Sequence, residues 1–98
     1  MARYRISPLA EQDLEAIGDF IAQDNPRRAL TFIAELRVQC DKIVASPKAF
    51  RARPELGEGI RSFTYGNYVI FFQDNPEELC IVRILHGAMD IESKFSEK

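Results

Sequence analysis

Few side chains in this 98-residue sequence have the chemistry of a catalytic or metal site. His86 is its single histidine, and its two cysteines, Cys40 and Cys80, form no Cys-x-x-Cys pair. Metal sites gather several such ligands, and cysteines among apolar residues are typically buried thiols. No serine lies in a nucleophile-elbow motif. We therefore predict no catalytic residue, no metal and no cofactor, and we expect both cysteines to be free thiols.

Arg83 is the most unusual charged residue, because it interrupts the apolar segment 79–85. A charge in a central strand costs about several kcal/mol of desolvation unless it is paired. Two interpretations follow. Arg83 pairs with a carboxylate, for which Glu11, Asp13 and Asp90 are candidates, or it lines a groove on an open face of the sheet. We favour the ion pair.

A basic stretch precedes the strand-forming half of the chain, and it is diluted by two glutamates. Its basic residues are Lys48, Arg51, Arg53 and Arg61. The net charge is −2 and the pI about 5.4, whereas a protein that binds phosphates usually carries a basic excess. We therefore favour a solvated loop, and we expect no direct nucleic-acid partner.

Length and composition predict one domain over residues 1–98, with 46% hydrophobic and 29% charged residues. The N-terminus has no apolar leader region, and no apolar run approaches membrane length. We therefore expect a cytoplasmic protein without a membrane partner.

Two segments carry the start signals of helices. Ser7-Pro8 supplies a capping hydroxyl and a first-turn proline, which predicts a helix over 8–23. Asn25-Pro26 repeats the signal for a second helix, which Ser46-Pro47 ends. Both helices have apolar residues at helical spacing, so the short link between them predicts an antiparallel hairpin.

The remaining segments alternate between strands and turns. Strands are predicted at 3–6, 61–65, 68–73 and 79–85, with a tight turn at 66–67, a loop over 48–60 and one or two helical turns within 88–98. The order β-α-α-β-β-β indicates an α+β fold, in which the helical hairpin packs on one face of a small, mainly antiparallel sheet.

In this order and spacing, the chain resembles the ParE toxins of the RelE/ParE toxin–antitoxin superfamily over nearly its whole length. The segment 82–90, with its His-x-x-Met-Asp ending, carries the strongest similarity. The other matching pieces are Tyr4–Pro8, Ala10, Asp13, Leu14, Ile17, Ala29, Phe32, Ser46, Pro47, Gly59–Ser62 and Asn67–Phe72.

The resemblance implies a toxin that is not an enzyme, inhibits DNA gyrase by protein–protein binding, and takes part in plasmid stabilisation. It also implies neutralisation by a ParD-like antitoxin. Residues at the exit of the last strand offer a mixed polar and apolar surface for the target: Arg83, His86, Met89 and Asp90. The surplus of aromatic residues suggests antitoxin contacts at Phe20, Arg61, Phe63 and Phe71.

The superfamily also contains RelE-like ribosome-dependent mRNA endonucleases, which are the alternative. Similarity to them is weaker, because Val69 stands where they place an arginine, and Lys94 or Phe95 where they place a tyrosine. Ala88 or Met89 replaces a further basic residue. A third alternative is an inactive member that retains antitoxin binding alone.

Overall fold

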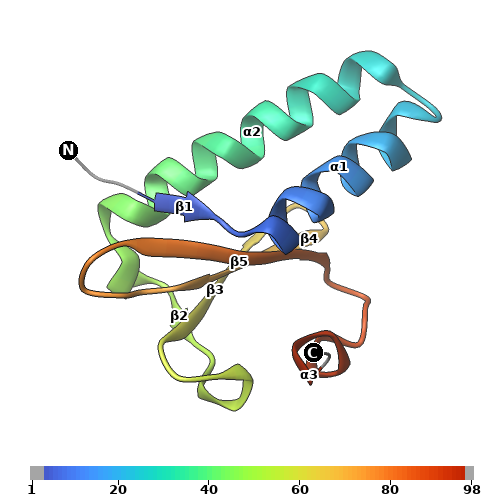
Figure 1. Cartoon of the computed structure of the whole chain (residues 1–98). Coiled ribbons are helices and arrows are strands. Elements are labelled where there is room, and N and C mark those ends of the chain that lie inside the picture. Colours follow the sequence, from blue (N-terminus) through green and yellow to red (C-terminus); the bar gives the residue numbers. More distant parts are fainter. Residues whose placement is uncertain (1–3, 97–98) are drawn as a thin grey trace.

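The computed structural model describes residues 4–96 and has a helical hairpin packed on a five-stranded sheet (Figure 1). The elements in chain order are β1 (Tyr4–Ile6), α1 (Pro8–Ala22), α2 (Pro26–Ala45), the 3-10 turn η1 (Pro47–Ala49), β2 (Arg51–Ala52), the 3-10 turn η2 (Pro54–Leu56), β3 (Ile60–Tyr65), β4 (Tyr68–Gln73), β5 (Leu79–His86) and α3 (Ile91–Ser96). The predicted α+β class is confirmed.

Side-chain caps fix the starts of both long helices. The Ser7 hydroxyl oxygen accepts a hydrogen bond from the Ala10 N–H at 3.0 Å, and the hydroxyl donates to the Val82 carbonyl at 2.9 Å. The Asn25 side chain accepts from the Arg28 N–H at 3.0 Å. A proline follows each cap, where its missing N–H costs nothing. Both predicted caps are therefore confirmed, and Ser7 also ties α1 to the sheet.

The sheet is mixed, with the strand order β1-β5-β4-β3-β2. The β1 strand runs parallel to β5, and the other neighbours are antiparallel. The predicted hairpin turn is confirmed, because Gly66 has a φ of 59° and Tyr65 pairs with Tyr68 across it. The prediction of a plain loop over 48–60 is wrong, since this segment contains β2 and two 3-10 turns. Two prolines keep these elements too short for periodicity to reveal them.

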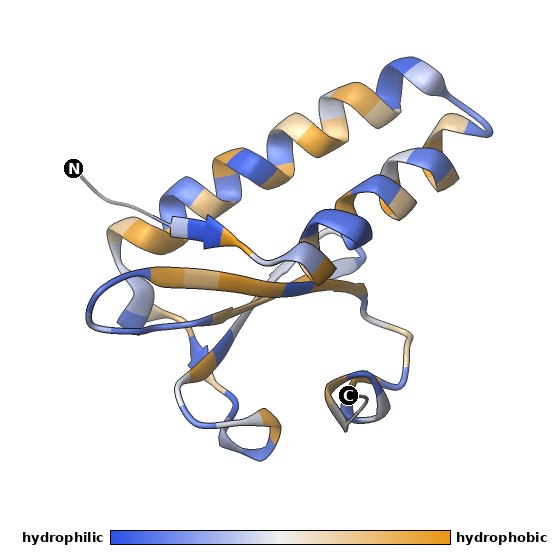
Figure 2. Ribbon diagram, in the orientation of Figure 1, coloured by the Kyte–Doolittle hydropathy of each residue, from blue (hydrophilic) through white to orange (hydrophobic). Residues whose placement is uncertain are grey.

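The main core lies between the helical hairpin and the sheet. It contains Ala10, Leu14, Ile17, Phe32, Leu36, Cys40, Ile43, Ile70, Phe72, Leu79, Ile81 and Ile84. The β5 strand is hydrophobic along most of its length (Figure 2). Burial raises the pKa of the Cys40 thiol to about 11, so this thiol stays protonated at neutral pH. Both cysteines are free, as expected.

A second, smaller core lies on the opposite face of the sheet. Ile60, Phe71 and Leu85 form it, and Ile91 and Phe95 of α3 pack against it. The α3 helix therefore lies on the other side of the sheet from the hairpin (Figure 1). The sequence predicted one or two helical turns within 88–98 but did not predict which face of the sheet they cover. Successive side chains of a strand point to opposite faces, so the continuous apolar run of β4 gives both faces an apolar surface.

An ion pair joins α1 to the middle of β5. The Arg83 guanidinium donates from Nε and Nη2 to the two carboxylate oxygens of Asp13, at 2.8 and 2.9 Å. The Ile84 N–H also donates to this carboxylate, at 2.9 Å. The predicted ion pair of Arg83 is confirmed, with Asp13 as its partner among the three candidates. The two side chains are only 15% and 12% exposed, so the pair is largely desolvated.

No helix within the described residues 4–96 is long and apolar enough to cross a membrane.

Replacing Asp13 by alanine should destabilise the fold substantially. The change leaves the Arg83 charge largely buried without this carboxylate, and we expect unfolding to become easier by about 2–4 kcal/mol. Glu78→Ala is the matched control, because Glu78 pairs with Arg5 at the surface and should contribute less than about 1 kcal/mol. Urea unfolding at constant m-value measures both. Similar losses for the two variants would contradict the role assigned to Asp13.

Candidate functional site

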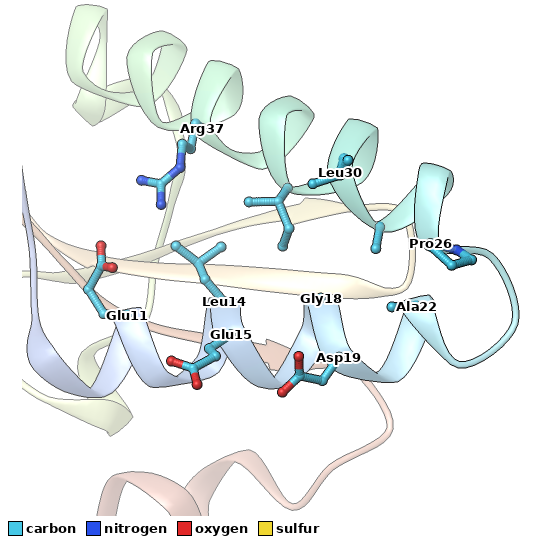
Figure 3. A pocket seen from close by; sticks show the side chains of 11 residues that line it. Glu11, Leu14, Glu15, Gly18, Asp19, Ala22, Pro26, Leu30 and Arg37 are labelled. Carbon is cyan, nitrogen blue, oxygen red and sulfur yellow. The ribbon is translucent and has the colours of Figure 1, made fainter.

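A groove runs between the two long helices, with a volume of about 500 Å³ (Figure 3). Its floor is apolar and includes Leu14, Gly18 and Ala22 from α1, and Ile33 from α2. A Cβ atom at Gly18 would lie 3.7 Å from the Ile33 side chain, so the two helices approach closely there. Leu30 stands on the α2 rim with 76% of its surface exposed. The hairpin therefore presents an apolar cleft that its own side chains leave open.

The α1 rim of this groove is acidic. Glu11, Glu15 and Asp19 follow one another at four-residue spacing, which places them on one side of the helix. Figure 3 shows Arg37 extending from α2 toward the end of α1 that carries Glu11. Within residues 4–96, none of the three carboxylates forms a salt bridge of 4.0 Å or shorter. The rim is thus a row of available negative charges beside an apolar floor.

A second, more apolar pocket of about 270 Å³ lies where β5 ends beside α1. Phe20, Tyr68, His86 and Met89 are among its lining residues. The His86 ring packs edge-on against Tyr68 with a centroid distance of 5.3 Å, and its Nδ1 accepts from the Ala88 N–H at 3.1 Å. This bond requires an unprotonated Nδ1. Phe20 is 67% exposed and Met89 44% exposed, so two large apolar side chains meet solvent here.

The four residues predicted to bind the target do not form one surface. His86 and Met89 line the second pocket. Arg83 lies beneath the surface, bound to Asp13. Asp90 is exposed, and its carboxylate accepts from the Ser93 N–H at 3.3 Å, which caps α3. His86 and Met89 are therefore accessible at a pocket, whereas Arg83 and Asp90 make local structural contacts.

The residues predicted to bind an antitoxin are also dispersed. Phe20 lines the second pocket, beside His86 and Met89 of the target set. Arg61 donates to the Phe50 carbonyl at 2.8 Å, and the Phe63 ring packs against the Phe50 ring at 4.9 Å.

The prediction that Phe71 is available to an antitoxin disagrees with the structure. Phe71 is fully buried, and its ring lies 5.0 Å from that of Phe95. Its side chain points to the face that α3 covers, so a partner reaches it only if α3 moves away.

The basic stretch is largely tied into the fold. Arg53 donates to Glu55 at 2.7 Å and to the Ser62 hydroxyl at 3.4 Å, and its guanidinium lies 5.7 Å from the centre of the Phe71 ring. Arg53 and Arg61, two of the four basic residues of the stretch, therefore help to hold the loop against the sheet.

A polar network holds the β3–β4 turn against α2. Glu35 accepts hydrogen bonds from Arg28 at 2.6 Å and from the Tyr65 hydroxyl at 2.7 Å. The bond from Arg28, and then that from Tyr65, lowers the pKa of Glu35. The bond to Glu35, followed by burial, raises the pKa of Tyr65. This network supports the turn and takes Glu35 out of the set of available surface charges.

The acidic rim of the groove was not anticipated from the sequence, although its signal is present. The spacing of Glu11, Glu15 and Asp19 marks one line along α1, and Gly18 and Ala22 mark a shallow line beside it. A polar helix face usually meets only water, so the pattern alone does not distinguish a solvated face from the rim of a cleft.

Chains of solved toxin–antitoxin systems share this fold. The structure is similar to a solved chromosomal ParDE toxin–antitoxin system from P. aeruginosa, with a TM-score of 0.74, 24% identity and coverage of 88% of this chain and 96% of that one. It is also similar to a chain of the RelBE2 toxin–antitoxin complex from Mycobacterium tuberculosis, with a TM-score of 0.59, 21% identity and coverage of 87% and 96%. At these identities the similarity establishes the fold.

Sequence comparison identifies the family. The model of the ParE toxin of the type II toxin–antitoxin system parDE matches residues 4–91. Toxin ParE1 of Mycobacterium tuberculosis is 31% identical over 93 residues, which cover 93% of this chain and 95% of the relative. Toxin ParE3 of Caulobacter vibrioides is 30% identical over 57 residues, or 58% of this chain and 57% of the relative. The chain therefore belongs to the ParE toxin family.

Phe95→Ala should destabilise the fold, because the Phe95 ring covers Phe71 and the second core. We expect a loss of about 1–3 kcal/mol, less than for a fully buried phenylalanine, since Phe95 is partly exposed. Phe20→Ala provides the same substitution at a site that is 67% exposed, and it should change stability by no more than about 0.5 kcal/mol. Thermal and urea unfolding compare the two variants. Equal effects would show that α3 does not hold the second core.

Glu35→Gln should lower the pH at which Tyr65 ionises, because it removes the carboxylate whose hydrogen bond with the Tyr65 hydroxyl raises the Tyr65 pKa. This pKa is raised on folding, so the contribution to stability is complete below about pH 10, the ordinary tyrosine value, and is lost as pH rises through the folded value. Tyrosinate absorbance follows the titration of all the tyrosines. Comparison with Tyr65→Phe shows which part of the absorbance change comes from Tyr65. Glu58→Gln, at an exposed loop residue, should leave it unchanged. An unaltered titration in Glu35→Gln would contradict the network.

Proposed function

We propose that this ParE-family toxin acts on DNA gyrase by protein–protein binding and is neutralised by a ParD-like antitoxin. The observation that carries the proposal is the second pocket, where an aromatic wall of Tyr68 and His86 meets the exposed side chains of Phe20 and Met89. Concave apolar sites of this kind typically hold the anchor side chains of a partner protein. Because gyrase and the antitoxin are intracellular, the proposal places the protein in the cytoplasm.

The contacts of the predicted target residues refine how they would act. Arg83 holds α1 against β5 through Asp13, so we assign it a positioning role. Asp90 caps α3, which also suits a positioning role. His86 and Met89 have the accessible side chains, and they are the residues that we propose contact the target.

The position of Phe20 suggests how neutralisation would work. Phe20 belongs to α1, and it lines the same pocket as His86 and Met89. An antitoxin segment that packs on this side of α1 would cover Phe20 and occlude the pocket. Antitoxin and target would then compete for one surface of the toxin, with no conformational change required. The solved relatives are described as toxin–antitoxin systems or complexes, which supports an antitoxin as the partner.

Met89→Ala and His86→Ala should each weaken gyrase inhibition by at least about tenfold, as expected for anchor residues of an interface. Val38→Ala is the control, because Val38 is 50% exposed on α2 and does not line this pocket. Gyrase supercoiling, growth arrest and thermal stability are measured for each variant beside the parent protein.

Two results would contradict the proposal. One is full gyrase inhibition by both pocket variants. The other is codon-specific cleavage of mRNA on translating ribosomes, lost on Arg61→Ala, which would identify the RelE-like activity instead.

A further inference from the structure

We propose that the outer face of the helical hairpin binds a second copy of this chain, so that the free toxin forms a twofold dimer through α1 and α2. This face consists of the groove between the two helices and the exposed side chains that border it. The partner is neither the proposed target nor the antitoxin, so the dimer is a property of the toxin by itself.

The α2 helix carries a row of apolar side chains on its solvent side. Leu30, Ala34 and Val38 are exposed and follow one another at four-residue spacing, which aligns them along one side of the helix. Leu30 also lines the groove, so the row and the groove adjoin. Single exposed apolar residues are ordinary, but a row beside an open apolar groove is typical of an interface. Within residues 4–96, this surface has no cover.

The charges of the hairpin are divided between its two helices. The α1 helix contains no lysine or arginine, and Glu11, Glu15 and Asp19 form the acidic rim of the groove. The α2 helix has an excess of basic residues, with four against two acidic ones: Arg27, Arg28, Arg37 and Lys42 against Glu35 and Asp41. Within residues 4–96, Arg27 and Arg37 form no salt bridge of 4.0 Å or shorter. The face is therefore complementary to a copy of itself if each helix meets the helix of the other kind.

A twofold axis that runs along the groove satisfies this condition. It places α1 of each copy over α2 of the other, whereas an axis across the groove would place the two acidic helices on each other. It also keeps every residue at its own level along the hairpin. Gly18 and Ile33 define one level, and with a rise of about 1.5 Å per residue, Glu15 and Arg37 lie at nearly the same level (Figure 3). Each Arg37 therefore faces Glu15 of the other copy.

The same axis gives the exposed Leu30 a place to pack. Leu30 lies on the loop side of Ile33, at a level between Gly18 and Ala22 (Figure 3). In the dimer it lies over the glycine and the alanine of the other copy, where small side chains leave the groove open. A leucine that is 76% exposed in the single chain is then removed from water, which stabilises the dimer. The contact is reciprocal, so it occurs twice.

The size of the face indicates a reversible dimer. The two helices are about 20–30 Å long and pack about 10 Å apart, so the face covers on the order of 500 Å² in each copy. A total of about 1,000 Å² is at the lower limit for specific association, and we expect a dissociation constant of about 1–100 µM. The second pocket shares no lining residue with the groove, so the dimer leaves both copies of that pocket accessible.

Sedimentation of the purified, full-length protein between about 1 and about 300 µM measures the monomer–dimer equilibrium. Leu30→Ala should weaken the dimer at least about tenfold, because it removes the central apolar contact. Leu9→Ala is the matched control. Leu9 is 51% exposed at the start of α1 and does not line the groove, so its replacement should leave the association unchanged.

Two charge reversals test the twofold arrangement. Glu15→Lys sets a lysine against Arg37 of the other copy, and Arg37→Glu sets a glutamate against Glu15, so each variant alone should dimerise at least about tenfold more weakly. An equimolar mixture should recover the dimer, because a mixed pair has one original and one reversed contact, both between opposite charges. The control variants Glu58→Lys and Arg51→Glu make the same changes at exposed positions outside the groove, and they should associate like the parent, alone or mixed.

Three outcomes would overturn the inference. A protein that remains monomeric at about 300 µM would leave the groove to a different partner. A dimer that Leu30→Ala and both charge reversals leave intact would lie on another face. Reversals that weaken the dimer without recovery in the mixture would exclude the twofold pairing. Met89→Ala should dimerise like the parent, so failure of the proposed gyrase contact is distinguishable from failure of the dimer.

Discussion

The Asp13 carboxylate is the contact on which the arrangement of the molecule depends. It accepts three hydrogen bonds from β5, two from the Arg83 guanidinium and one from the Ile84 N–H. This pairing helps to make a charge acceptable in a strand that is otherwise apolar and largely buried. Together with the bond from Ser7 to the Val82 carbonyl, it fixes both the position and the rotation of α1 against the sheet. The rotation decides where every other side chain of α1 points. The floor and acidic rim of the groove, and the exposed Phe20, are consequences of it.

The parts of the fold that short-range chemistry determines could be predicted from the sequence. The Ser7 and Asn25 caps, with their following prolines, define the helix starts, and Gly66 defines the hairpin turn. The sequence predicted that a carboxylate pairs with Arg83, but it contained three candidates and did not distinguish Asp13 from the other two. The choice depends on the rotation of α1 against β5, which is set by packing between residues seventy positions apart. The position of α3 was missed for a similar reason. A strand that is apolar on both faces needs a cover on each, and the sequence does not say which segment provides it.

Predictions about the site were limited because the sequence gives the type of each residue but not whether its side chain is exposed. Aromatic residues suggested a binding surface, yet Phe71 is buried beneath Phe95 whereas Phe20 is exposed. Phe20 was assigned to the antitoxin, and His86 and Met89 to the target, because they lie far apart in the sequence. The structure brings the three to one pocket, since α1 passes the end of β5. Two sets that the sequence separates are therefore one surface, which is the physical basis for proposing competition between the antitoxin and the target.

The two surfaces of α1 suit different parts of recognition. The pocket around Phe20 and Met89 is largely apolar, and apolar burial supplies free energy of binding without much discrimination among partners of similar shape. The rim formed by Glu15 and Asp19 has the opposite character. Exposed ion pairs add little affinity in water, but mismatched charges exclude a wrong partner and matched charges speed association with the right one. Both surfaces belong to a single helix whose rotation Asp13 fixes, and they lie on different sides of it, so a partner that covers both must wrap around the outer surface of α1.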